Sequence, residues 1–540
     1  MQPVHAERAG AVDPRRWWTL GAMCLAMAMT FLDATIVNVA LPSIQRGLSA
    51  SLSDLQWVLD AYTLALAVLL VSGGRFGDLF GRKRVVLAGV AVFTLGSAMG
   101  GLAQDIGFLI AARALQGVGG AMLIPGTLSI ITQSFDGPER GAAIGIWSGV
   151  SSLAIALGPV VGGVLVEKAT WQSIFWVNVP VGVCTVIIGM YTVRESTDET
   201  ASRRIDVAGV GLITLALLAL SIAFIEGDSK GWTSLFTLGM MGGGVLLLLL
   251  FALNEARTRH ALLDLRFFRL PTFSGANVAI FASTFSMFAY YFLLSLYLQD
   301  LLGYSALEAG LRLLPETLIV ALVAPFAGRI TDRFGPRNPL AAGMFLLAVS
   351  LLLATRWTAT TSYAGLLPAL LLNGIGQGLV TTPAMAAVMG SVPRERSGAA
   401  SGVVNTMRQV GGLLGVAALG ALFSHLVSSQ FVEKAAGLGL GDRLTPLGQQ
   451  VAGGGVKAVI GLAPDVAERA RAAATTAFVH GFSETLYVNA AVLLIGTLVA
   501  LLFVKSDRFG AVIAEDEHEP PRATEPDRTD AAALITDVRA

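Results

Sequence analysis

Three ionisable residues stand deep inside apolar stretches of this chain. Asp33 interrupts MTFLDATIVNVALPSI (residues 29–44), and Arg113 and Glu316 interrupt two further stretches. At 1.5 Å per helical residue, each lies about 10–12 Å from the end of its stretch that is predicted to face the outside of the membrane. Charges at such depth in a bilayer are costly and usually functional. A buried carboxylate that takes up a proton on one side of a membrane and releases it on the other couples a proton gradient to transport, so these residues predict proton coupling.

Structural roles remain open for the same residues. Asp33 could hydrogen-bond to a nearby threonine such as Thr35 or to another helix, and Arg113 could form an interhelical pair. Glu316 follows Arg312 by four residues, so the two could pair on one helix face.

Other polar residues inside apolar stretches are weaker candidates for substrate binding or gating. Asp60 lies only about five residues into its stretch, so we expect it to reach the membrane interface. Arg408 lies beside Asn405 and Gln409 and indicates a structural or gating role. These candidates are Asn38, Asp60, Gln116 and Arg408.

The composition defines the class of protein. The 540 residues are 54% hydrophobic and 14% charged, whereas soluble chains are about a quarter charged. Acidic and basic residues balance, so no basic excess points to nucleic acid. Cys24 and Cys184 lie in apolar stretches and are predicted to be small core side chains. No HExxH, CxxC, GxSxG or P-loop pattern is present, so we expect no metal, no cofactor and no enzymatic activity.

Fourteen apolar stretches are long enough to cross a bilayer as helices. An even number of spans places both termini on one side. Most basic residues of the short loops fall on that side, whereas the opposite short loops hold only Arg46, Lys168, Lys230 and Arg356. Both termini are therefore predicted to be cytoplasmic, in a multi-pass protein of the plasma membrane. The expected spans are 17–41, 55–74, 84–103, 106–132, 141–166, 171–193, 205–226, 232–254, 271–300, 308–330, 338–357, 363–391, 399–425 and 482–504.

The chain also repeats itself at an offset of about 255 residues. GGRFGDLFGRKR (73–84) returns as AGRITDRFGPR (327–337), and GPERGAAIGI (137–146) returns as PRERSGAASGV (393–403). We therefore predict an all-α membrane fold of two six-helix halves plus two inserted helices, which suits a transporter that rocks about a midplane site.

The predicted domains follow from the spans and the repeat. A long extracellular loop with one candidate amphipathic helix near 464–480 interrupts the second half, and the polar C-terminal tail is expected to be disordered. The domains are 1–16 (cytoplasmic tail), 17–193 (first half), 205–254 (inserted pair), 271–504 (second half), 426–481 (extracellular loop) and 505–540 (cytoplasmic tail).

The repeated loop combines glycines, a carboxylate and basic residues. Asp78 can accept hydrogen bonds from a helix N-terminus or an arginine and so lock one packing of the bundle. We predict a conformational latch, with a simple topology anchor as the alternative. The latch residues are Gly74, Asp78, Gly81, Arg82 and Lys83, with Asp332 in the second half.

The fifth stretch carries small residues at four-residue spacing beside a proline. Such spacing lets helices touch closely in lipid, and proline bends a helix. A proton-leak seal and an ordinary packing seam fit this pattern equally well. The residues are Gly149, Gly158, Pro159, Gly162 and Gly163.

Together these motifs carry a family resemblance over nearly the whole chain. The chain resembles the major facilitator superfamily, specifically its fourteen-helix drug:proton antiporter branch. The repeated loop and the fifth stretch match that family's loop and antiporter motifs. The further matching residues are Arg113, Gln116 and Gly117; Asp33, Thr35, Asn38, Ala40, Leu41 and Pro42; residues 171–182; and Asn405, Arg408 and Gln409.

The resemblance implies export of a drug, antibiotic or related metabolite in exchange for protons. An importer, a lipid or natural-product translocator and a membrane sensor remain alternatives. Asp33, Asp60 and Glu316 suit lipophilic cations, whereas Arg113 and Arg312 leave anions and zwitterions open. We expect a small amphiphilic substrate, protons and membrane lipid as partners, no nucleic acid, and a functional monomer.

Overall fold

The computed structural model describes residues 14–135, 137–197, 206–258, 265–392, 397–454 and 464–506, and this part of the chain consists of helices and their connections, without a strand. The first half contains α1 (Arg16–Leu48), α2 (Leu52–Phe80), α3 (Arg82–Gly101), α4 (Ile106–Ser134), α5 (Gly137–Lys168), α6 (Ser173–Trp176) and α7 (Asn178–Thr192). The inserted pair is α8 (Val207–Lys230) and α9 (Leu235–Arg257).

The second half follows a short 3₁₀ turn, η1 (Leu265–Arg269). It contains α10 (Pro271–Leu296), the π-helical turn η2 (Tyr297–Leu301), α11 (Ala306–Phe334), α12 (Arg337–Ala354), α13 (Tyr363–Gly390), α14 (Ser397–Ala435), α15 (Leu444–Gly454) and α16 (Pro464–Phe503), with 3₁₀ turns η4 (Ala436–Leu438) and η5 (Gly441–Arg443) before α15.

Local capping fixes where several of these helices begin. Ser51 and Ser305 form capping boxes with Asp54 and Glu308 at the starts of α2 and α11, and Asp105 accepts the backbone N–H of the third residue of α4. Such caps pair N–H groups that the first helical turn leaves unsatisfied. Polar residues between apolar stretches therefore set the register of these spans.

Thirteen helical segments in the described chain are long and apolar enough to cross a membrane, or fourteen when two parts of α5 count as one span. Those parts, Gly149–Ile155 and Leu157–Lys168, meet at 44°. The bend precedes Pro159, whose ring and missing N–H weaken the preceding turn. This multi-pass, all-α architecture confirms the predicted fold class.

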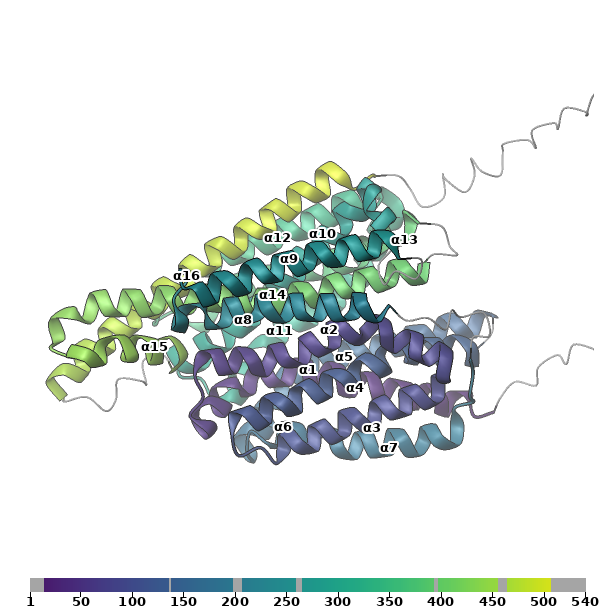
Figure 1. Ribbon diagram of the computed structural model, residues 1–540, viewed down its shortest axis with the longest axis horizontal. Helices are drawn as coiled ribbons and strands as arrows, with labels where there is room; N and C mark the ends of the chain where they lie inside the picture. Colours follow the sequence, from purple (N-terminus) through teal and green to yellow (C-terminus); the bar gives the residue numbers. More distant parts are fainter. Residues whose placement is uncertain are drawn as a thin grey trace, which may run out of the picture.

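The two halves pack their helices in the same order, as the internal repeat predicts. In the first half α1 packs on α5 and α7, α4 packs on α2 and α3, and α3 packs on α7. In the second half the equivalent pairs are α10 with α14 and α16, α13 with α11 and α12, and α12 with α16. Figure 1 shows the halves side by side, with the first half in purple to blue.

Both described ends of the chain lie at one end of the bundle, the terminal end, and the opposite end is the distal end (Figure 1). Near the distal end α10 and η2 bind α1: Ser295 Oγ of α10 donates to the carbonyl of Asn38 at 2.5 Å, and Gln299 Nε2 of η2 donates to that of Val39 at 2.9 Å. On another side Gln56 Nε2 of α2 donates to the carbonyl of Val416 on α14 at 3.1 Å. These contacts hold the two halves together in the distal part of the bundle.

The inserted pair lies against one side of this junction. Helix α8 packs on both α2 and α14, and α9 packs on α8. Leu217 of α8 meets Val68 of α2 and Leu413 of α14 in one apolar cluster. The inserted pair therefore bridges the two halves where α2 meets α14.

The predicted extracellular loop contains more helix than the sequence indicated. Residues 426–435 continue α14, and the candidate helix near 464–480 is the start of α16 rather than a separate element. Phe423 of α14 packs edge-on against Phe478 of α16, and this apolar pairing lets both helices extend beyond the bundle. Figure 1 shows them projecting together with α15.

One burial prediction is wrong, and some predictions fall outside the described residues. Cys24 is buried, but Cys184 is exposed on α7, because the outer face of a membrane helix is apolar without being buried in protein. Residues 1–13 and 507–540 of the predicted tails, residues 455–463 of the predicted loop and the side chain of Asp78 lie outside the part that the structure describes.

Candidate functional site

A buried ion pair joins α1 to α4 in the first half. Arg113 Nη1 lies 2.5 Å from Asp33 Oδ2, and the two residues are 1% and 0% exposed. Neither Thr30 nor Thr35 bonds this carboxylate; their hydroxyls donate to carbonyls of α1 itself. The structure thus brings together two of the three residues predicted for proton coupling.

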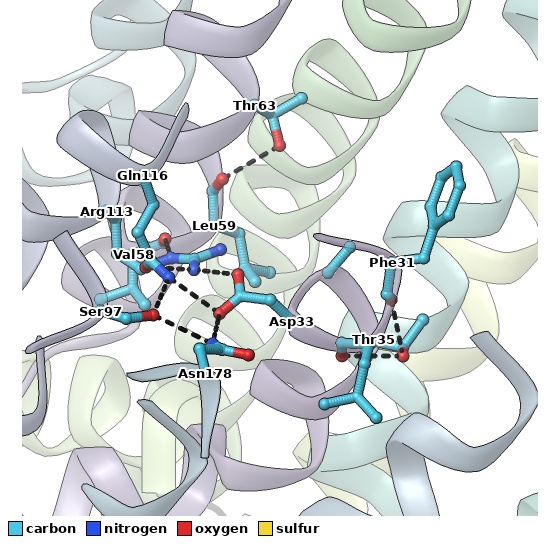
Figure 2. A network of polar contacts seen from close by, with 12 residues as sticks. Phe31, Asp33, Thr35, Val58, Leu59, Thr63, Ser97, Arg113, Gln116 and Asn178 are labelled. Carbon is cyan, nitrogen blue, oxygen red and sulfur yellow. Dashed lines mark hydrogen bonds and ion pairs between the residues drawn. The ribbon is translucent and has the colours of Figure 1, made fainter. Parts of the chain in front are cut away.

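Two amides complete the surroundings of the carboxylate. Gln116 Nε2 and Asn178 Nδ2 donate to Asp33 Oδ1 at 2.9 and 3.0 Å, and both also donate to Ser97 Oγ. These groups come from α1, α3, α4 and α7, and they point toward one another in Figure 2. Because every neighbour presents an N–H to Asp33, the network fits the ionised carboxylate, which only accepts. A proton on Asp33 would face donors on each side.

Arg113 also holds α2. Its Nε donates to the carbonyl of Val58 at 3.1 Å, its Nη1 donates to Gln116 Oε1 at 2.8 Å, and its guanidinium carbon lies 4.5 Å from the centre of the Tyr62 ring. A planar guanidinium can make these hydrogen bonds and stack on a ring at the same time. One residue of α4 therefore fixes α1 and α2 together.

The helices held by this network also carry the distal contacts between the halves. Asp33 precedes Asn38, whose carbonyl accepts from α10, by five residues of α1, or about 7.5 Å along the helix. Val58 follows Gln56, which donates to α14, by two residues of α2. The Asp33–Arg113 pair therefore joins the two helices that meet the second half at the junction.

Glu316 lies apart from this network, in the second half. It is fully buried on α11 and accepts a hydrogen bond from Tyr291 of α10 at 2.9 Å, while its Oε2 has no partner among the described residues. The alternative pairing with Arg312 does not form, because Arg312 lies 3.8 Å from Glu308 and stacks on Tyr304. Each half thus has its own buried carboxylate.

Asp60 corrects the sequence prediction of an interfacial position. It is 1% exposed, and neither carboxylate oxygen has a hydrogen-bond partner in the described chain. On α2 it lies one turn from Gln56, which bonds α14, and one turn from Leu64, which packs in the cluster of α2, α8 and α14. Residues four apart share a helix face, so Asp60 lies at the junction of the halves.

The remaining candidates for substrate binding or gating differ in their environment. Asn38 bonds the carbonyl of Ala34 through its side chain and accepts from α10 through its carbonyl, whereas Gln116 belongs to the Asp33 network. Arg408 is partly buried on α14. The sequence therefore identified one direct participant in the ion-pair network and one in the junction.

The predicted latch loop is organised by a residue that the sequence analysis missed. Glu195, which follows α7, accepts the backbone N–H groups of Lys83 and Arg84 at 3.0 and 3.3 Å and so caps α3. Gly81 has φ +107°, a conformation that favours glycine. Arg82 donates its backbone N–H to the carbonyl of Ser196, Gly74 lies near Pro125 of α4, and Asp332 is exposed on α11.

The motif of the fifth span divides between two surfaces. A side chain at Gly158 would collide with Thr35, and one at Gly162 with Ile36, so these glycines let α5 approach α1. Gly163 faces the backbone of Leu307, and Pro159 faces Gly310, both on α11. Gly149 is exposed, with open space around it. Four of the five predicted residues therefore lie in tight helix contacts, two of them between the halves.

Sequence analysis missed two residues of the ion-pair network. Asn178 lies in IFWVNVPVG, where an amide among apolar residues was the available signal. Ser97 lies in LGSAMGG, where a serine among small residues gives no such signal, because it equally suits close helix packing.

Two six-helix halves that meet beside a buried ion pair define a secondary membrane transporter. The Major Facilitator Superfamily model matches residues 23–416, and the chain belongs to this superfamily.

Curated relatives and a solved structure agree with this membership. The tetracenomycin C resistance and export protein of Streptomyces glaucescens is 36% identical and covers 79% of each chain. The multidrug resistance protein Stp of Mycobacterium tuberculosis is 38% identical and covers 76% of each chain. The chain also superposes on a solved structure, that of a bacterial homologue of the human lysosomal transporter Spinster in an inward-facing and unoccupied conformation. The TM-score is 0.63 over 92% of this chain and all of that chain, at 18% sequence identity, which shows the shared fold.

Proposed function

We propose that this protein is a proton-driven exporter that exchanges protons for a drug, antibiotic or related lipophilic metabolite across the plasma membrane, acting as a monomer. The names of its relatives, which denote resistance and export, support such a substrate. The single observation that carries the proton coupling is the Asp33–Arg113 pair, buried among donors that suit the ionised carboxylate.

Basic residues support a cytoplasmic position for the terminal end. Lys83, Arg84 and Arg194 cluster there, as the positive-inside rule requires of a cytoplasmic face. The contacts of α1 with α10 and η2 then form an extracellular gate, which is closed in this arrangement.

The charge of Asp33 and the extracellular gate are coupled, because α1 carries both Asp33 and the gate contacts. With the gate closed, Asp33 is ionised, which is the state after a proton has left for the cytoplasm. In the outward-open state Asp33 takes a proton from outside, and a proton on Oδ2 no longer matches the Arg113 N–H that faces this oxygen. Return to the closed arrangement restores the ion pair once the proton is released inward. Substrate leaves in the opposite direction while the carrier faces out.

The proton gradient is sufficient for this exchange. A driving force of about 150 mV supplies about 3.5 kcal/mol per proton. That free energy sustains a gradient of about 300-fold for a neutral substrate.

Glu316 and Asp60 extend the proposal. Glu316 is a second proton-binding carboxylate, supported by its burial and its single hydroxyl partner. Asp60, buried at the α2–α14 junction without a partner in the described chain, is supported in a gating role, because an ionised carboxylate is far more costly there than a protonated one. The α2–α3 connection with Asp78, and Asp332 of α11 in the second half, remain proposed as a latch, and the fifth span remains proposed as a seal.

The test uses purified protein in sealed liposomes with a pH-sensitive dye inside and an imposed pH gradient. Ethidium and tetracenomycin C serve as substrates, for the wild type, Asp33→Asn and Asp105→Asn. Asp105→Asn is the matched control because asparagine also caps a helix. We expect substrate-dependent proton movement in the wild type and the control, and its loss in Asp33→Asn.

Equal proton movement in all three proteins would remove Asp33 from the coupling step. Substrate movement that is independent of the pH gradient in the wild type would overturn antiport. A proton flux in the same direction as the substrate would establish an importer instead.

A further inference from the structure

Helix α15 belongs to the second half of the chain but rests partly on the first half. It packs on α14, α16 and α2. Val451 and Ala452 of α15 are fully buried, although α15 lies in the part that projects beyond the bundle with the ends of α14 and α16 (Figure 1). Leu52, the first residue of α2, is also buried and belongs to the same apolar core. One short helix therefore bridges the two halves at the distal end.

Two glycines let α15 approach both halves closely. A Cβ at Gly448 would lie 2.9 Å from Ser428 Oγ on α14. A Cβ at Gly453 would lie 2.7 Å from Gln45 Nε2 on α1 and 3.5 Å from Leu52 Cβ on α2. Glycine permits such close approach because it has no side chain of its own. The first glycine thus seats α15 on the second half, and the other seats it on the first half.

Gly453 meets the turn that joins α1 to α2, the two helices that carry the distal contacts of the first half. The turn is short and well defined: Ser49 ends α1 in the left-handed conformation, with φ 52°, and Ser51 caps α2. Leu52 precedes Gln56, which donates to α14, by four residues, or about 6 Å along the helix. The seat of α15 is therefore directly next to the junction of the halves.

We propose that α15 is a strap of the extracellular gate. In the closed arrangement it holds the α1–α2 turn to the second half, and it leaves that turn when the bundle opens outward. Helix α15 packs more extensively on α14 than on α2, so the contact with the first half is the one that breaks. The strap rests on the proposed function for its extracellular position and for the outward opening that it controls.

Reversible disulfides test the strap in the full chain, in a background with Cys24→Ala and Cys184→Ala. The pair Leu52→Cys/Gly453→Cys joins α15 to the first half. Its Cβ separation of 3.5 Å lies within the range of natural disulfides.

The matched control is Ser428→Cys/Gly448→Cys, which joins α15 to α14 within the second half. Both pairs place a disulfide on the same short helix. The control therefore differs from the first pair in leaving the two halves free to separate.

Backbone hydrogen exchange in nanodiscs, followed by mass spectrometry over residues 36–48 and 295–304, reports how often the gate opens. Oxidation of the Leu52/Gly453 pair should slow exchange in these segments about tenfold or more, because the opening that exposes them is then blocked. Reduction should restore the wild-type exchange rate. The Ser428/Gly448 pair should exchange at the wild-type rate in both redox states.

Unchanged exchange after complete oxidation of the Leu52/Gly453 pair, or equal slowing in the control pair, would overturn the strap. Failure of the first pair to cross-link under conditions that cross-link the control would also overturn it.

Substrate-dependent proton movement, recorded on the same proteins in liposomes, separates the strap from the proposed function. Loss of this movement on oxidation of the Leu52/Gly453 pair alone supports both. Its absence in the wild type and in the reduced pairs would contradict antiport, whereas the exchange rates would still decide the strap.

Discussion

Arg113 Nη1 of α4 lies 2.5 Å from Asp33 Oδ2 of α1, although 80 residues separate the two in the chain. Arg113 also holds the backbone of α2 through the carbonyl of Val58. A charge pair in a bilayer-spanning bundle thus ties together the two helices whose distal parts bind the second half.

Removing one partner of this pair should destabilise the protein more than removing both. Arg113→Met leaves Asp33 buried without its cation, a loss of about 3–5 kcal/mol. Asp33→Asn/Arg113→Met removes both charges and should recover most of that loss. Thermal unfolding of the purified variants in one detergent measures the difference.

Arg312→Met is the control for this cycle, because Arg312 is partly exposed and pairs with Glu308. A partly exposed pair of this kind contributes about 1 kcal/mol or less. Additive effects of Asp33→Asn and Arg113→Met would show that the two side chains do not interact in the folded protein.

Asp60→Leu should leave stability unchanged or raise it. The carboxylate is buried with no hydrogen-bond partner in the described chain, so an apolar side chain removes a desolvation cost of about 1–3 kcal/mol. Transport should nevertheless fall, because we assign Asp60 to the gate. Unfolding temperature and dye-reported transport are measured on the same preparations.

Asp54→Leu on the same helix should have the opposite effect and lower the stability of the protein. It destroys the capping box at the start of α2 and should cost about 1 kcal/mol. If Asp60→Leu destabilises the protein more than Asp54→Leu does, Asp60 has a partner that the described contacts do not include.

Substitutions of Glu316 and of Tyr291 should change the stability of the protein by different amounts. Tyr291→Phe leaves the buried carboxylate without its donor and should cost about 1–3 kcal/mol, whereas Glu316→Gln keeps an acceptor for the hydroxyl and should stay near wild type. Glu316→Gln should also move fewer protons per substrate, with the Asp33 site still working. Unfolding curves and the proton-to-substrate ratio in liposomes test these outcomes.

Tyr363→Phe is the matched control, since its hydroxyl donates to a backbone carbonyl of α11 rather than to Glu316. An unchanged proton-to-substrate ratio in Glu316→Gln would confine Glu316 to a structural role.

Gly310→Ala should loosen the distal contact of the halves. A Cβ there would collide with the backbone of Pro159 on α5, whereas Gly149→Ala meets open space. In a background without Cys24 and Cys184, a reporter at Ser295→Cys should react faster with a membrane-impermeant maleimide in Gly310→Ala. If Gly149→Ala accelerates labelling equally, the contact between α5 and α11 does not control the gate.

Much of this architecture was predictable from local sequence. Apolar length defined the spans, and the repeat of GGRFGDLFGRKR as AGRITDRFGPR defined two equivalent halves. Asp33, Arg113 and Glu316 could be selected because a charge inside an apolar helix stands out against its neighbours.

Helix pairing decided the rest. Periodicity gives each helix its faces but does not state which face meets which partner. Only the packed bundle shows that Asn178 and Ser97 join the network of Asp33. It also shows that Tyr291, rather than Arg312, bonds Glu316. The burial of Asp60 at the α2–α14 junction and the exposure of Cys184 on the outer surface likewise appear only in the packed bundle. The sequence alone determined the helices and the residues able to carry charge. The tertiary structure alone decided the partners of these residues, because the contacts join residues that are far apart in the chain. The distance between such residues depends on how closely the helices approach, and small side chains at the helix contacts set that approach.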